Sequence, residues 1–383
     1  MKSYAKSNKL KYETKDSPDQ VHQQIREKAT AYFKGHRSRR ANVALWLKAL
    51  SLVVLIGLSY YSLLHSGTFL ILLLSYIAFG FTFLLLGINI GHDAAHNCVT
   101  GNHRVDNVLF QIIFGLQGLS GYVWKLRHNF SHHIFPNIYD NDSDLELSKL
   151  VLLSPHEKKM SIHKYQHIYV PFMYIWFSLI WIFYVDFAML FKKKHANIKL
   201  NRVPPLEYIK LIVIKATYLY TFLYLPHFFT GLPFTTILVA YLIMNFSISL
   251  FLAFTFYISH HVLETKYAEA RYENTLVKSS WIRHQIVSTT DFNIDSKLGN
   301  YIFGGFNLHV AHHIFPEVSH VHYPALTKII RETLDENQLN WYKSFGFFEG
   351  VASHLSLLKK TGRGEFEIEE ELEEKLDEEL VVA

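Results

Sequence analysis

Cysteine is almost absent from this chain, since Cys98 is the only one among 383 residues. A single cysteine excludes an intrachain disulfide, and the lack of a Cys-x2-Cys pair argues against the common zinc and iron–sulfur sites built on such pairs. The first 40 residues are polar and lack the apolar core of a cleavable signal peptide. No nucleic-acid-binding motif and no internal repeat is present, so we expect no nucleic-acid partner.

Apolar residues, in contrast, are abundant and gathered in long runs. Half of the residues are hydrophobic, 15% are aromatic and the mean hydropathy is +0.09, which argues against a soluble fold. A bilayer-spanning helix needs about 20 apolar residues. Four runs reach this length, at about 42–64, 68–90, 208–229 and 234–259. Only short breaks, at 65–67 and 230–233, separate the members of each pair, so we expect two transmembrane hairpins.

A fifth apolar run, at 168–191, is predicted to lie in the membrane or at its surface without crossing it. Lys164 precedes this run and Lys192–Lys194 follow it, and cationic flanks stay in the cytoplasm. The basic residues of 34–40 likewise place the start of the first hairpin in the cytoplasm. We therefore predict an all-α, multi-pass integral membrane protein with a helical cap and both termini on the cytoplasmic side.

The distribution of charge divides the chain into three parts. We expect a cytoplasmic N-terminal segment (1–40), a membrane domain (41–360) and an acidic tail (361–383). The last 20 residues hold ten acids and one lysine, and the remainder has a formal charge of +14. This basic body suits anionic lipid headgroups, an anionic substrate headgroup or an acidic electron-donor protein.

Histidine supplies the pattern that points to chemistry. Eight of the 23 histidines lie in three short clusters beside the apolar runs: His92 and His96; His128, His132 and His133; and His309, His312 and His313. On a helix, His92 and His96 share one face, as do His128 and His132, and two imidazoles so placed can bind one metal ion. The ring of His133 points about 100° away from that of His132. Two neighbouring metal ions use such a ring better than one does.

The number and setting of these ligands favour two iron ions. Scattered histidine pairs arise by chance in a chain with 23 histidines, but chance explains poorly three dense clusters at the cytoplasmic ends of the spans. Imidazole suits zinc, copper, iron and nickel. Zinc would hydrolyse, whereas iron activates dioxygen, and a site supplied from a bilayer meets mostly hydrocarbon. Because unactivated C–H bonds require an oxidant, iron is the better choice.

The residues around the three clusters resemble those of the membrane fatty acid desaturase family. The similarity spans about 40–345 and rests on GHDAAH (91–96), WKLRHNFSHH (124–133), WIRHQIVSTTD (281–291) and HVAHHIFP (309–316). It is closest to the acyl-CoA or acyl-lipid branch that includes linoleoyl-CoA and other front-end desaturases. The resemblance implies O2-dependent formation of a cis double bond in a fatty acyl-CoA or acyl-lipid, at two non-haem irons.

The resemblance also implies a ninth ligand and an external source of electrons. The family has one further ligand after the last span, where His261 matches better than its neighbour His260. Fused front-end enzymes often have Gln in place of His309, so the position of the double bond stays open. We expect no fused cytochrome b5 domain, and therefore a separate donor of ferredoxin or cytochrome b5 type. The expected ligands are His92, His96, His128, His132, His133, His261, His309, His312 and His313.

Carboxylates beside the clusters are candidates to support the ligands. A metal-binding histidine usually donates its second N–H to a carboxylate or a carbonyl. Asp93, Glu264 and Asp291 are the expected partners, although a solvated role is equally open for each.

Two other functions remain open at this stage. A hydroxylase or ketolase on the same scaffold would use the same ligands, and the motif contexts favour desaturation over it. A metal transporter or sensor would need polar ligands within the spans. The apolar runs contain almost none, because the histidines gather at their cytoplasmic ends.

Overall fold

The computed structural model describes residues 4–6, 10–12, 20–34, 38–145, 148–192, 194–268, 276–277 and 279–366. The fold is mostly helical and contains four long apolar helices and one bent helix pair, which confirms the predicted class. Residues 367–383, most of the predicted acidic tail, lie outside the described residues. The last described helix, α17 (Phe347–Arg363), continues slightly beyond the expected domain boundary at 360.

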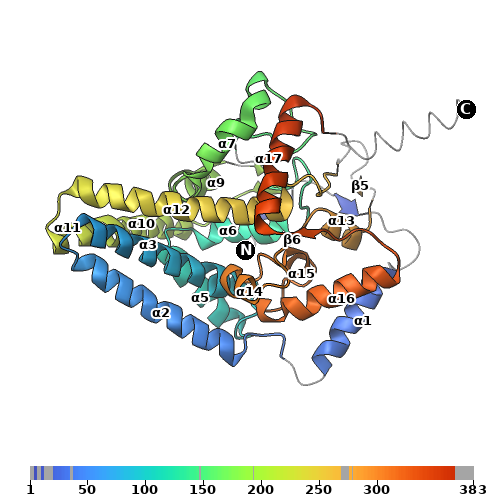
Figure 1. Cartoon of the computed structure of the whole chain (residues 1–383), viewed down its shortest axis with the longest axis horizontal. Coiled ribbons are helices and arrows are strands. Elements are labelled where there is room, and N and C mark those ends of the chain that lie inside the picture. The colour runs from blue at the N-terminus through green and yellow to red at the C-terminus, as the bar shows by residue number, and fades with distance from the viewer. Residues whose placement is uncertain are drawn as a thin grey trace, which may run out of the picture.

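The four predicted spans are all present, in two hairpins (Figure 1). The side chain of Asn42 caps the first span by accepting a hydrogen bond from the N–H of Leu45, and Gly231 ends the third span with a positive φ of 66°. The spans are α2 (Val43–Leu64); α3 (Phe69–Leu86) continued by the π-helical η1 (Gly87–Gly91) and α4 (His92–Ala95); α10 (Pro205–Leu219) continued by the π-helical η5 (Tyr220–Tyr224) and α11 (Leu225–Thr230); and α12 (Phe234–His260).

The second and fourth spans form the inner pair. They are buried over 44% and 39% of their most apolar windows, against 17% and 22% for the first and third spans. Much of the apolar surface of α2 and α10 is exposed, as expected for helices that face lipid. The inner pair ends at His92–Ala95 and at His260, so both inner helices deliver histidines to the same end of the bundle.

The fifth apolar run forms two helical arms with an angle of 79° between them. The first arm contains the 3-10 helix η3 (Ser161–Tyr165) and α7 (Gln166–Tyr174). The second arm contains α8 (Phe177–Ile180), the π-helical η4 (Trp181–Val185) and α9 (Asp186–Phe191). Asp186 is fully buried, and one of its carboxylate oxygens lies 2.6 Å from Nζ of Lys215 on α10.

A cap of shorter helices covers the end of the bundle where the histidines lie, on the right of Figure 1. Its apolar core joins α1 to α13, α15 and α16. The helices are α1 (Gln20–Lys34), α5 (His103–Leu116), α6 (Gly121–Arg127), the π-helical η2 (His128–His132), α13 (Trp281–Val287), α14 (Lys297–Phe303), α15 (His309–Ile314), the 3-10 helix η6 (His320–His322) and α16 (Tyr323–Glu336).

In the part of the chain that the structure describes, short strands add to the predicted all-helical architecture. They form three small sheets, in the orders β1-β4-β3, β2-β5 and β6-β7. At two or three residues each, they are too short for the alternating pattern that identifies a strand in sequence. They are β1 (Tyr4–Lys6), β2 (Lys11–Tyr12), β3 (Lys194–His195), β4 (Ile198–Leu200), β5 (Leu276–Val277), β6 (Asp291–Phe292) and β7 (Ser344–Phe345).

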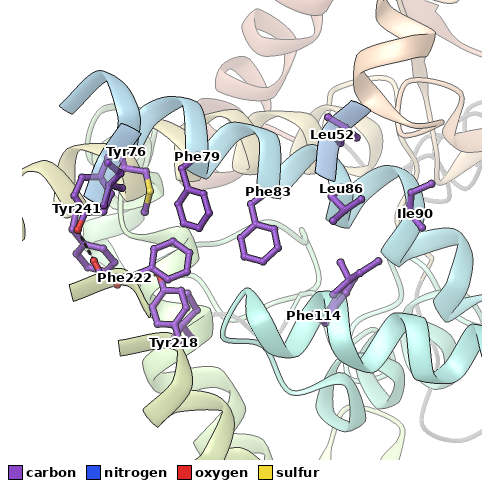
Figure 2. Packing of buried hydrophobic residues seen from close by; sticks show 14 of the residues in the cluster. Leu52, Tyr76, Phe79, Phe83, Leu86, Ile90, Phe114, Tyr218, Phe222 and Tyr241 are labelled. Atoms are coloured by element: carbon purple, nitrogen blue, oxygen red, sulfur yellow. Dashed lines mark hydrogen bonds between the residues drawn. The ribbon is translucent and has the colours of Figure 1, made fainter. Parts of the chain in front are cut away.

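Aromatic and aliphatic side chains fill the interior of the bundle (Figure 2). Phe79 on α3 lies 5.0 Å from Phe222 on η5 between ring centroids. The hydroxyl of Tyr76 donates to the carbonyl of Phe222 at 2.5 Å, and the hydroxyl of Tyr241 donates to that of Tyr218 at 3.1 Å. The contacts of Tyr76 and Phe79 with Phe222 tie the two hairpins together, and the Tyr241–Tyr218 bond joins the two spans of the second hairpin.

Candidate metal centre

All three histidine clusters meet at one place between the inner spans and the cap. His92 and His96 end the second span, and His260 ends the fourth. The remaining clustered histidines lie on η2, immediately after it, and on α15. Elements from both halves of the chain therefore build a single site, as the sequence predicts.

The histidines form two groups of four, in each of which one ligand atom per residue lies within 4.8 Å of the others. The sequence clusters do not map onto single groups, because the second and third clusters each contribute to both. The first group is His92, His96, His128 and His312; the second is His132, His260, His309 and His313.

The π-helical geometry of η2 explains why its histidines separate. On an α-helix His128 and His132 would share a face, and that expectation suggests a common metal. In η2 the backbone bonds run from residue i to i+5, so residues four apart no longer lie one above the other. The rings of His128 and His132 lie 5.7 Å apart between centroids and belong to different groups.

His133 lies between the two groups. Its Nε2 is 2.9 Å from Nε2 of His128. Its ring centroid is 4.5 Å from those of both His312, in the first group, and His313, in the second. This position agrees with the expectation that His133 serves a two-metal arrangement.

His260, and not His261, lies in the second group. Nε2 of His260 is 3.1 Å from Nε2 of His132. His261 leaves the helix, and its Nδ1 is hydrogen-bonded at 2.9 Å to the hydroxyl of Tyr267. The sequence ranks His261 first, but the point at which α12 ends turns its ring away from the group.

Polar partners hold the second nitrogen of several group members. Nδ1 of His132 donates to the carboxylate of Asp142 at 3.0 Å, and Nδ1 of His313 donates to the amide oxygen of Gln285 at 2.9 Å. Because these oxygens only accept, the Nδ1 atoms carry the protons and the Nε2 atoms keep their lone pairs. Nδ1 of His260 is held in the same way by the carbonyl of Ser288, and Nδ1 of His312 is hydrogen-bonded to the hydroxyl of Tyr323, which can donate or accept.

The three carboxylates expected to support the ligands bind elsewhere. Asp93 accepts from Ser319, Glu264 accepts from Ser353, and Asp291 accepts from the backbone N–H of Val310. Asp142 takes the expected role, and its only sequence signal is the acidic stretch that follows the second cluster. The Gln285, Ser288 and Tyr323 partners carry no sequence signal, because they come from distant segments.

Burial keeps most of these rings neutral. It is the main cause, ahead of the neighbouring imidazoles, that lowers the pKa of His96, His128, His133, His309, His312 and His313. His132 differs because Asp142 and Asp144 outweigh burial and raise its pKa. A metal ion takes the neutral imidazole, so the lowered pKa values favour binding.

The donor set fits metal ions. Six ring nitrogens are buried without a hydrogen-bond partner: Nδ1 of His92, His133 and His309, and Nε2 of His96, His312 and His313. Buried polar atoms are rarely left unpaired. Here they belong to rings of the two groups and of His133, and the Nε2 atoms of His92 and His128 face each other at 3.2 Å. Metal ions would satisfy such an all-nitrogen set, and iron is among those that imidazole suits.

Comparison with known proteins identifies the family. Residues 67–345, more than half of the chain, match the family described as "Fatty acid desaturase". This protein belongs to the fatty acid desaturase family. The match confirms the resemblance read from the sequence motifs and assigns the chain to the oxidoreductases.

Individual relatives are distant but cover most of the desaturase. It is 27% identical to a sn-1 linoleoyl-lipid 6-desaturase of Synechocystis sp. over 88% of this chain and 94% of the relative. It is 28% identical to an acyl-lipid (8-3)-desaturase of Physcomitrium patens over 90% and 72%, respectively. It is also 27% identical to a sn-1 linoleoyl-lipid 6-desaturase of Arthrospira platensis over 88% and 91%.

An apolar cavity extends from the histidines of the desaturase into the bundle. On α3 and its continuation, the lining residues Gly80, Leu84, Ile88 and His92 recur every four positions and mark one helix face. At 1.5 Å per residue, Gly80 lies about 18 Å along the helix from His92. The opposite wall on α12 runs from His260 to Met244. The cavity therefore connects the metal centre with the aromatic packing of Figure 2.

Proposed function

We propose that this protein is an O2-dependent, diiron fatty acyl desaturase that introduces a cis double bond into an acyl-lipid. The observation that carries the proposal is the pair of adjacent four-histidine groups at one end of an apolar cavity. In the net reaction, two neighbouring methylene groups each lose one hydrogen, and O2 takes up two further electrons and two protons to give two waters. A bound iron pair supplies the oxidising power that unactivated C–H bonds require.

Nine histidines would hold the irons. We assign His92, His96, His128 and His312 to one iron, and His132, His260, His309 and His313 to the other. His133 is the ninth ligand, and we assign it to the first iron because its Nε2 approaches that of His128 at 2.9 Å. His260 replaces His261 in the set predicted from sequence, because only the ring of His260 reaches the second group.

The substrate would place its acyl chain in the cavity with the methyl end toward Met244. The lining is mostly aromatic and aliphatic, which excludes water and holds the chain by burial of apolar surface. An acyl-lipid is favoured over an acyl-CoA because the relatives named above are lipid desaturases. The headgroup would remain at the basic cytoplasmic surface.

The chain's own residues would position and protect the reaction. The ring of Trp124 lies 4.2 Å from that of His128, and the ring of Phe306 lies 4.6 Å from that of His92. These two side chains also line the cavity, so they would keep water away from the reacting carbons. Electrons would come from a separate donor of ferredoxin or cytochrome b5 type on the cytoplasmic side.

The test is to measure metal content and products in the same preparation. The purified protein, loaded anaerobically with ferrous iron, should contain about two irons per chain. When it is supplied with lipid, O2 and an electron-donor system, gas chromatography with mass spectrometry should detect a new cis double bond. His132→Ala and His312→Ala should each abolish turnover.

The control is His227→Ala, on α11 at the end of the third span away from the histidine groups, which should keep turnover. Stable zinc binding without oxygen consumption would refute the proposal. So would full turnover in either variant of a proposed ligand.

A further inference from the structure

A short N-terminal segment packs against the outside of the second histidine cluster. This segment, Leu10–Tyr12, is called the N-terminal strap. Its β2 strand pairs in parallel with β5, with Tyr12 opposite Val277. Leu10 is buried in a small apolar cluster with Phe135 and Ile138, which follow the second histidine cluster in the chain. A segment far away in sequence therefore forms part of the wall around this cluster.

Tyr12 fixes the main chain where it leaves the second cluster. Its hydroxyl donates to the carbonyl of Ile134 at 2.6 Å, one residue after His133. Its ring lies 5.3 Å from that of His284, whose Nε2 donates to the carbonyl of Pro136 at 2.8 Å. Two carbonyls directly after the cluster are thus held from the outside, one by Tyr12 and one by the ring against which Tyr12 packs.

Tyr12 is also linked, through His284, to the support of a ligand from the third cluster. Gln285 directly follows His284, against whose ring Tyr12 packs. The amide oxygen of the same Gln285 accepts the hydrogen bond from Nδ1 of His313. Tyr12 therefore packs beside the residue that precedes the support of His313. The peptide after Pro136, whose carbonyl His284 holds, donates the N–H of Asn137 to Asp142, the support of His132. His132 and His313 both belong to the second group.

We infer that Tyr12 is a positioning residue that keeps the second histidine group in its metal-binding arrangement. The inference rests on the proposed diiron function and deepens it, because it assigns a role to a residue outside the segment that matches the family, 67–345. Among the proposed ligands of the first iron, only His133 lies next to these contacts, because Ile134 follows it in the chain. The effect of losing Tyr12 should consequently fall on one iron more than on the other.

The experiment compares iron retention in the full-length protein and three variants. Tyr12→Ala removes the ring and the hydroxyl, Tyr12→Phe removes only the hydroxyl, and Lys11→Ala changes an exposed neighbour on the same strap. Each protein is loaded with ferrous iron, and the release of iron to a coloured chelator is followed over time. Thermal unfolding is measured in parallel.

Wild type and Lys11→Ala should retain two irons and release them at similar rates. Supports of metal ligands are typically worth 10–100-fold in affinity. Tyr12→Ala should therefore release one iron about tenfold faster, or lose it during purification, while the second iron stays. Tyr12→Phe should fall between the two, because the ring still packs on His284.

Three results would overturn the inference. Unchanged release in Tyr12→Ala would show that Tyr12 does not position the group, with the diiron proposal still standing. Loss of both irons together, with a lower unfolding temperature, would mean that Tyr12 only stabilises the fold. A wild-type protein that does not bind two irons would remove the proposed function itself, and the inference with it.

Discussion

At the scale of single residues, the second ring nitrogen decides where a ligand histidine points. His132 illustrates this, since Asp142 holds its Nδ1 and leaves Nε2 facing the group. Asp142 is itself fixed, because its carboxylate accepts from the backbone N–H groups of Asn137 and Asp144, both at 2.9 Å. The histidine clusters that meet in the two groups could be predicted from the sequence because their spacing is dense and local, whereas His260 was ranked behind His261. The residues that hydrogen-bond their second ring nitrogens could not be predicted, because most of these residues come from distant segments and meet the histidines only in the folded chain.

Asp142→Asn should weaken the binding of iron to the second histidine group. The substitution removes the negative charge beside His132. It also places an NH2 group where one of the two backbone N–H groups now donates, so the side chain cannot keep all its bonds. Iron affinity should fall about 10–100-fold, with a matching loss of turnover at limiting iron. An iron titration measures this, with Asp295→Asn, an exposed carboxylate, as the control. Equal affinities in the two variants would contradict the role of Asp142.

His260→Ala and His261→Ala should differ clearly in iron content and in activity, although the two residues are adjacent. His260→Ala removes a member of the second group and should abolish desaturation and reduce the iron content. His261→Ala removes only the bond to Tyr267 and should keep both irons. Iron analysis and product analysis on both variants decide the assignment. The opposite outcome would restore the ranking read from the sequence, which cannot locate the last turn of α12 to one residue.

At the scale of elements, apolar runs predict the spans but not their internal geometry. The hairpins are found within a few residues of the predicted limits, because run length and short breaks fix them. The π-helical turns at η1 and η2 were not predicted, since one shifted backbone bond leaves no compositional trace. This matters for function, because η2 distributes its histidines between both metal groups. The assumption of regular α spacing placed His128 and His132 on one face and missed that distribution.

The attachment of the bent helix pair to α10 should depend on the buried ion pair between Asp186 and Lys215. Lys215 on α10 donates to Asp186 on α9 and to the carbonyl of Gly118, which precedes the histidine-bearing η2. Lys215→Met leaves the buried carboxylate without a counter-ion and should lower the free energy of unfolding by about 3–5 kcal/mol. The double variant Lys215→Met/Asp186→Leu should recover most of this loss, because no unpaired charge remains.

Thermal unfolding in detergent tests the ion pair, and the same helix offers a matched control. Lys210 forms an exposed pair with Glu207, so Lys210→Met should change stability by less than about 1 kcal/mol. Equal losses of stability in Lys215→Met and Lys210→Met would show that the buried ion pair contributes no more than the exposed one.

The contact between α3 and α12 should limit the length of the acyl chain. A Cβ added at Gly80 would lie 2.5 Å from Cγ of Met244, so Gly80→Ala must push that flexible side chain aside at the deep end of the cavity. The variant should disfavour the longest chains, and Met244→Ala should favour them. Each methylene excluded from burial is worth about 0.8 kcal/mol, or roughly fourfold in relative kcat/KM.

Competition between acyl chains of different length measures this preference directly. Gly57→Ala on the lipid-facing α2 is the control, because no atom lies within 4 Å of its added Cβ. An unchanged preference in both cavity variants would place the methyl end elsewhere.

At the scale of the whole molecule, the metal centre itself constrains the topology. The first and second clusters come before the bent pair, and His260 and the third cluster come after α12. Because they share one site, the chain must cross the bilayer an even number of times between them. The spans α10–α11 and α12 supply two crossings, so the bent pair must enter and leave on the same side. The sequence predicts the same arrangement from the parity of the crossings and from the basic residues that flank the run.

The same reasoning predicts which residues a reagent outside the cell can reach. In a Cys98→Ala background, Arg202→Cys tests the segment after the bent pair and Gly67→Cys tests the loop of the first hairpin; both positions are exposed. With the cap in the cytoplasm, a membrane-impermeant maleimide should label Gly67→Cys in intact cells and should label Arg202→Cys only after permeabilisation. Labelling of both in intact cells would mean that the bent pair crosses the bilayer. Labelling of Arg202→Cys alone would mean that the orientation is reversed while the even number of crossings holds.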